Sequence, residues 1–99
     1  MDDRYADFAA LAAAERRGRD YDIVVREVAG SPVAIVAPHA GDIEPGTSEI
    51  AVTIAGGDCN LYLFEGHGPD AYRLHVMSSH FDEPECLALV TRCAVVVTV

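Results

Sequence analysis

The sequence predicts an α/β protein in which helices flank a mixed β-sheet. Segments with apolar residues at helical spacing alternate with short apolar runs rich in β-branched residues, in the order α-β-β-α-β-β-α-β. Interleaving of this kind is typical of a sheet covered by helices rather than of a helical bundle or a β-sandwich. The chain has 99 residues, of which 51% are hydrophobic and 23% charged, and this balance indicates one folded domain rather than a disordered tail.

The first half of the chain contains one predicted helix and two predicted strands. Apolar residues at helical spacing, including Phe8 and Leu11, predict a helix over residues 5–17, which a glycine terminates after two arginines. A run of β-branched residues predicts a strand over residues 21–28. After a Gly-Ser-Pro turn, the continuous apolar run 33–37 predicts a strand buried in the middle of a covered sheet.

The second half begins with a predicted loop over residues 38–46, followed by a helix that Thr47 or Ser48 caps and two glycines end. The further predicted elements are strands over 61–64 and 72–77, a helix from Pro84 to residue 93, and a final strand over 94–99. Polar side chains gather in two loops that follow strands, where open α/β sheets usually bind ligands.

The charge balance and the cysteine pattern exclude several classes of function. Sixteen carboxylates outnumber seven basic residues, all of them arginine, and the formal net charge of −9 argues against binding to nucleic acid or to an anionic membrane. Three cysteines without a CxxC pair indicate a reducing compartment rather than a disulfide framework. The sequence contains neither a signal-peptide pattern nor the roughly 20 consecutive apolar residues of a membrane span. We therefore expect a cytoplasmic protein with no nucleic-acid partner and no membrane partner.

His39 and Glu44 form the strongest candidate site in the sequence. An apolar strand leads to His39, and Glu44 follows five residues later, in a glycine-containing loop that precedes a helix. This spacing does not place two ligands on one helical face, but a loop with glycine can fold both side chains toward one point. Imidazole nitrogen and carboxylate oxygen bind zinc, and catalytic zinc sites often use two histidines and one glutamate. The alternative is that His39 caps a strand end while Glu44 stabilises the helix N-terminus.

A second candidate site is the polar segment 78–83. Its side chains that can bind a metal or a substrate are those of Ser79, His80, Asp82 and Glu83. His80 lies among hydroxyl and carboxylate side chains, an environment that favours a metal ligand or a substrate contact. The alternative for Asp82 and Glu83 is that they cap the helix that follows. His75 lies within a predicted strand, and we expect it to be a core histidine.

Four segments of the chain carry a family resemblance when they are taken together. They are Tyr5-Ala-Asp-Phe-Ala-Ala-Leu11, Ala37-Pro-His-Ala-Gly-Asp-Ile-Glu-Pro-Gly-Thr-Ser-Glu-Ile50, Leu61-Tyr-Leu-Phe-Glu-Gly66 and Leu74-His-Val-Met-Ser-Ser-His-Phe-Asp-Glu-Pro84. In this order they resemble the poly-gamma-glutamate hydrolases, a family of zinc metallopeptidases known from bacteriophages and bacterial genomes. The four segments span nearly the whole chain, which makes the resemblance more specific than any single motif.

The resemblance implies a fold similar to that of zinc carboxypeptidases and hydrolysis of γ-glutamyl amide bonds, in a polymer or in short peptides. It implies that His39 and Glu44 bind the zinc. The implied third ligand is a histidine that directly follows the strand 94–99, and the implied general-base glutamate lies beyond Val99, because family members are considerably longer. We therefore expect residues 1–99 to be a single partial domain, the N-terminal half of a zinc-peptidase-like domain.

The remaining candidate residues fall on the expected substrate side. The resemblance places Ser79 and Asp82 near the active site, and Arg73 is the basic residue near the candidate loops that would bind an anionic γ-glutamyl chain. His80 is expected either to contact substrate or to replace the third zinc ligand. A different class of function is a truncated, non-catalytic remnant that binds a partner or associates with itself through its unpaired terminal strand.

Overall fold

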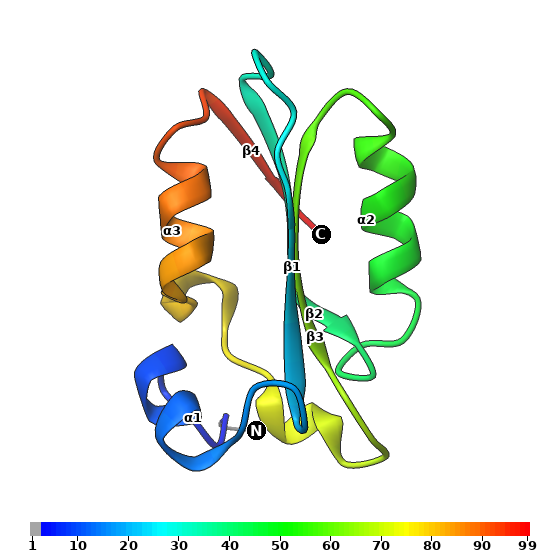
Figure 1. Ribbon diagram of the computed structural model, residues 1–99. Coiled ribbons are helices and arrows are strands. Elements are labelled where there is room, and N and C mark those ends of the chain that lie inside the picture. Colours follow the sequence, from blue (N-terminus) through cyan, green and yellow to red (C-terminus); the bar gives the residue numbers. More distant parts are fainter. Residues whose placement is uncertain (1–2) are drawn as a thin grey trace.

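The computed structural model describes residues 3–99, which form a four-stranded mixed sheet with helices on both faces (Figure 1). The elements in chain order are α1 (Phe8–Ala14), β1 (Tyr21–Arg26), β2 (Val33–Gly41), α2 (Thr47–Ala55), β3 (Asn60–Gly66), the 3-10 helices η1 (Ala71–Leu74) and η2 (Ser78–His80), α3 (Pro84–Val90) and β4 (Val95–Thr98). The strand order is β1-β3-β2-β4, in which β1 is antiparallel to β3 while β2 is parallel to β3 and to β4. α2 covers one face of the sheet, and α1 and α3 lie on the other.

The two central strands are buried on both faces, so the predicted fold class is confirmed. Residues 34–40 of β2 and 60–64 of β3 are buried without interruption, as the apolar run in β2 predicted. Each face of the sheet has its own hydrophobic core. The core beneath α1 and α3 includes Leu11, Tyr62, Phe64, Leu74 and Leu89, and the core beneath α2 includes Ile35, Ala51, Ala55, Leu61 and Leu63.

The predicted strand over residues 72–77 is wrong. The backbone there forms η1, in which the amides of Arg73 and His75 donate to carbonyls three residues earlier. Leu74 and Val76 are fully buried, and this alternation is what suggested a strand. β1 and β2 lie on the two sides of β3, so the segment does not pair with the strand that precedes it in the sequence. The segment therefore crosses the end of the sheet and buries its apolar residues in the core beneath α1 and α3.

β2 is longer than predicted, and the predicted loop 38–46 begins later as a result. Pro38 and His39 continue the strand at a shift in its register with β3, between Ala37 and Ala40. Proline has no amide hydrogen to donate to a neighbouring strand, so an irregularity at this point of a central strand follows from the sequence. The extension holds His39 on the end of a buried strand rather than in a loop.

The cap of α2 also differs from the prediction. The N-cap residue is Gly46, not Thr47 or Ser48. The Ser48 hydroxyl instead accepts a hydrogen bond from the amide of Gly41 and donates one to Glu65, so it joins the end of β2 to the end of β3. α1 and α3 are both shorter than predicted. No helix within residues 3–99 has the length and hydropathy needed to cross a membrane.

β4 confirms the predicted final strand and forms one edge of the sheet as described. It pairs with β2 alone among the described strands. Its three valines, Val95, Val96 and Val97, are 40–50% exposed, so both faces of the strand are partly open to solvent. An apolar edge strand with both faces open is a surface that another strand can extend.

Candidate metal centre

The end of β2 and the loop after it bring His39 and Glu44 together. Nδ1 of the buried His39 lies 3.4 Å from Oε1 of Glu44, whose side chain is half exposed. The loop closes on itself, because the amide of Glu44 donates to the carbonyl of His39. Gly41 has φ +65°, and a Cβ there would lie 2.6 Å from the carbonyl oxygen of Gly66, so the loop requires glycine at this point.

His75 is the third member of this group, although the sequence pattern indicated a core histidine. Its Nε2 lies 3.6 Å from the same Glu44 oxygen, and its ring stacks on that of His39, with centroids 3.9 Å apart and planes 18° apart. One ligand atom from each of the three residues lies within 4.8 Å of the others. The Pro69-Asp70 pair before η1 is a turn signal, and it is the sequence feature that could have argued against a strand here.

One hydrogen bond on each of the His39 and His75 rings indicates which ring nitrogen carries the proton. Nε2 of His39 lies 2.6 Å from the carbonyl oxygen of Val76, which can only accept, so Nε2 carries the proton. Nδ1 of His75 lies 2.8 Å from Oδ1 of Asp3 and donates to that carboxylate. In the neutral imidazoles, Nδ1 of His39 and Nε2 of His75 are therefore the nitrogens without a proton, and they lie 3.4 and 3.6 Å from Oε1 of Glu44. The two imidazole nitrogens and the Glu44 oxygen lie within 4.8 Å of one another, and a cation among them would stabilise this arrangement.

Burial keeps His39 in the form that binds metal, and hydrogen bonds keep Asp3 ionised. Burial lowers the pKa of His39 below its usual value of 6.5, and His75 adds to this effect, while a backbone hydrogen bond and Glu44 oppose it. Partial burial raises the pKa of Asp3, but hydrogen bonds from His75 and from the Met77 amide outweigh it, so the pKa of Asp3 is lowered. His39 is thus neutral at neutral pH, and neutral imidazole is the form that binds a metal.

The donor set fits zinc. Bonds of about 2.0–2.1 Å in a tetrahedral zinc site place neighbouring ligand atoms about 3.4 Å apart. The distances from Oε1 of Glu44 to the two imidazole nitrogens are 3.4 and 3.6 Å. An imidazole binds along a lone pair in the plane of its ring, so one of the stacked rings of His39 and His75 must tilt for both to reach one ion. Catalytic zinc sites use three protein ligands, and the number of donors gathered here would match that set.

Comparison with known proteins identifies the family. A sequence model of the poly-gamma-glutamate hydrolase family matches residues 5–99. The chain belongs to this family. It is 45% identical over 83 residues to the UPF0714 protein YmaC and 42% identical over 89 residues to the UPF0714 protein YndL, both from Bacillus subtilis. The matches cover 83% and 89% of this chain and 34% of each relative, so the chain spans about a third of the curated relatives it matches.

Two solved structures share the fold of this poly-gamma-glutamate hydrolase family member. The zinc-free apo form of YndL superposes with a TM-score of 0.89 at 39% identity. The structure of bacteriophage poly-gamma-glutamate hydrolase superposes with a TM-score of 0.87 at 40% identity. Each match covers 98% of this chain and 47% of the solved chain. The family and the fold that the four sequence segments predicted are both confirmed.

The polar segment after η1 divides between the surface and the helix ends. Ser79 and His80 lie in η2 and are exposed. Within the described residues, His80 does not belong to the group formed by His39, Glu44 and His75. Asp82 does not cap α3, because its Oδ1 accepts a hydrogen bond of 2.9 Å from the amide of Phe8 at the start of α1. Glu83 does cap α3, since it accepts from two backbone amides of the first turn.

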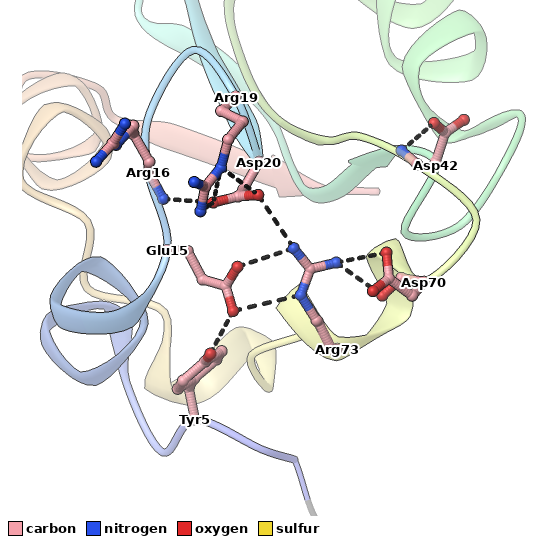
Figure 2. Close-up of polar contacts among 9 residues, drawn as sticks. Tyr5, Glu15, Arg16, Arg19, Asp20, Asp42, Asp70 and Arg73 are labelled. Carbon is pink, nitrogen blue, oxygen red and sulfur yellow. Dashed lines mark hydrogen bonds and ion pairs between the residues drawn. The ribbon is translucent and has the colours of Figure 1, made fainter.

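Arg73 is surrounded by three carboxylates (Figure 2). Its Nη2 lies 2.8 Å from Glu15 and 3.3 Å from Asp20, and its Nη1 lies 2.8 Å from Asp70. The Arg73 side chain is 15% exposed, and the Tyr5 hydroxyl donates to Glu15 beside it. The hydrogen bond from Arg73 lowers the pKa of Glu15, against the opposing effect of burial. The Arg73 guanidinium thereby connects η1 to the segment between α1 and β1. His75 directly follows η1.

Proposed function

We propose that this chain is part of a zinc-dependent hydrolase that cleaves γ-glutamyl amide bonds in a polymer or in short peptides. The observation that carries the proposal is that one nitrogen of each of two imidazoles lies within 3.6 Å of the same Glu44 oxygen, while the other nitrogen of each ring is already hydrogen bonded. Family membership and the bacteriophage poly-gamma-glutamate hydrolase support the substrate class. A relative whose apo form is zinc-free supports the choice of metal.

The chain's own residues hold the metal in this proposal. His39 and Glu44 bind zinc through Nδ1 and a carboxylate oxygen, and bound zinc activates water and polarises the scissile carbonyl. His75 is the third ligand that the described residues offer. The resemblance implies instead a histidine that follows β4 in longer relatives, together with a general-base glutamate from the part of those relatives that this chain does not match.

The substrate side is proposed to be the surface around η1 and η2. Ser79 and His80 are exposed and free to contact a γ-glutamyl chain. The side chain of Asp70 is 77% exposed, so a substrate carboxylate can take its place on Nη1 of Arg73. Asp82 uses Oδ1 for the α1 amide and keeps its other oxygen for a substrate amide.

A chimera tests the proposed function. The matching segment of YndL is replaced by residues 3–99, and the release of soluble fragments from poly-gamma-glutamate is measured, with α-linked polyglutamate as the comparison substrate. We expect cleavage of the γ-linked polymer, loss of cleavage in His39→Ala and Glu44→Ala, and retention in the exposed control Asp58→Asn. A folded, zinc-loaded chimera that leaves the γ-linked polymer intact would contradict the proposal.

The exposed valines of β4 favour a second candidate function, association of two copies of the chain through their β4 edges. Sedimentation over a range of concentrations tests it. We expect a concentration-dependent dimer that Val96→Lys abolishes. Val52→Lys on α2 is a matched control, because Val52 is 45% exposed and Val96 is 44% exposed. A monomer at all concentrations excludes this function.

A further inference from the structure

We propose that Asp3 is a positioning residue that orients both imidazoles of the candidate metal centre, an inference that rests on the metal site proposed above. Asp3 lies outside the residues that the family's sequence model matches. Both of its carboxylate oxygens are engaged. Oδ1 accepts from Nδ1 of His75 and Oδ2 accepts from the amide of Met77, each at 2.8 Å. The side chain is 21% exposed, so these bonds are partly shielded from water.

The hydrogen bond to His75 acts on that ring directly. It keeps the proton on Nδ1 and leaves Nε2 as the atom that faces Glu44. A carboxylate behind a metal-binding histidine raises the basicity of the imidazole and sets its orientation. Asp3 therefore holds His75 in the tautomer that a cation beside Glu44 requires.

The hydrogen bond to Met77 acts on His39 through a single peptide group. The peptide between Val76 and Met77 donates its N–H to Asp3, and its carbonyl accepts from Nε2 of His39 at 2.6 Å. A trans peptide is planar, and its N–H and C=O point in opposite directions. Fixing the direction of the N–H therefore fixes the direction of the carbonyl. One carboxylate thus orients two rings, the second without touching it.

Nitrogen-15 NMR of the histidine side chains in the metal-free protein tests the proposal. In the wild type we expect the Nδ1–H tautomer for His75 and the Nε2–H tautomer for His39. Asp3→Ala should convert His75 to a mixture of tautomers. Zinc affinity, measured by competition with a chelator, should fall about 10-fold to 100-fold, the usual effect of removing such partners. Asp58→Asn is the control and should change neither quantity, because Asp58 is exposed after the end of α2 and is not one of the three residues of the candidate metal centre.

The two readouts separate the possible results. A folded Asp3→Ala variant with wild-type tautomers and wild-type zinc affinity would overturn the role of Asp3. If the wild type itself binds no zinc, the proposed function fails, while the tautomers of the metal-free protein still decide on Asp3. Asp3→Asn preserves the size of the side chain and one acceptor oxygen, so an intermediate change is expected. It serves as the test variant if Asp3→Ala does not fold.

Discussion

The imidazole rings of His39 and His75 stack with their centroids 3.9 Å apart and their planes 18° apart. The stack joins two parts of the chain that are distant in sequence. His39 lies near the C-terminal end of β2, and His75 directly follows η1. The free nitrogens of the two rings both face Glu44. The site is therefore assembled by tertiary structure, and each of its supports can be removed separately.

The first prediction concerns the third ligand. His75→Ala should lower zinc affinity at least about 10-fold, because it removes one of three converging donors. His80→Ala should leave the affinity unchanged, because His80 is exposed in η2 and outside this group. Chelator competition measures both. The opposite ranking of the two variants would show that His80, not His75, completes the site.

The second prediction concerns the loop between His39 and Glu44. Gly41→Ala should destabilise the protein by about 2 kcal/mol or more, because alanine at φ +65° is strained and its Cβ would meet the Gly66 carbonyl. Gly57→Ala is the control, since nothing lies within 4 Å of a Cβ there. Urea unfolding measures the difference. Equal stability of the two variants would contradict the proposed tightness of the loop.

The third prediction concerns the ion pairs that Arg73 makes with Glu15, Asp20 and Asp70, called the Arg73 cluster below (Figure 2). Arg73→Met should lower the free energy of unfolding by about 3 kcal/mol, since it leaves the shielded Glu15 carboxylate without its cation. Arg92→Met is the matched control, because the Arg92–Glu27 pair is more than half exposed and such pairs contribute about 1 kcal/mol or less. Urea unfolding of both variants provides the test. Equal losses would show that the cluster is no stronger than a surface pair.

The fourth prediction concerns pH. The hydrogen bond from Arg73 lowers the pKa of Glu15 in the folded protein below its ordinary value of 4.5. The contribution of Glu15 to stability is therefore present above pH 4.5 and disappears as the pH falls through the lowered pKa. The stability difference between wild type and Glu15→Gln should shrink over that acid range. A difference that stays constant as the pH falls would contradict the assignment.

The fold class and the family followed from the sequence because their signals are local and repeated. The apolar run in β2 and the helical spacing around Leu11 predicted which of these residues are buried. Four short segments together indicated the family. The predicted pair of His39 and Glu44 does lie close in space. A histidine after an apolar strand and a glutamate across a glycine loop form a pattern that spans only a few residues.

His75 and the partners of Arg73 could not be predicted in the same way. Leu74 and Val76 alternate as they would in a strand, but the backbone forms η1 and buries both side chains in the core beneath α1 and α3. Asp3 lies 72 residues before His75 in the sequence, and Glu15 lies 58 residues before Arg73. No periodicity or spacing connects such distant residues. They meet because η1 crosses the end of the sheet.

We propose above that His39 and Glu44 bind zinc. The decisive experiment is metal analysis of the protein, purified without chelators and supplied with zinc. We expect about one zinc per chain for the wild type, because one site with these ligands holds one ion. Both His39→Ala and Glu44→Ala should lose that zinc. A wild-type protein without zinc, or variants that retain all of it, would show that His39 and Glu44 do not bind zinc.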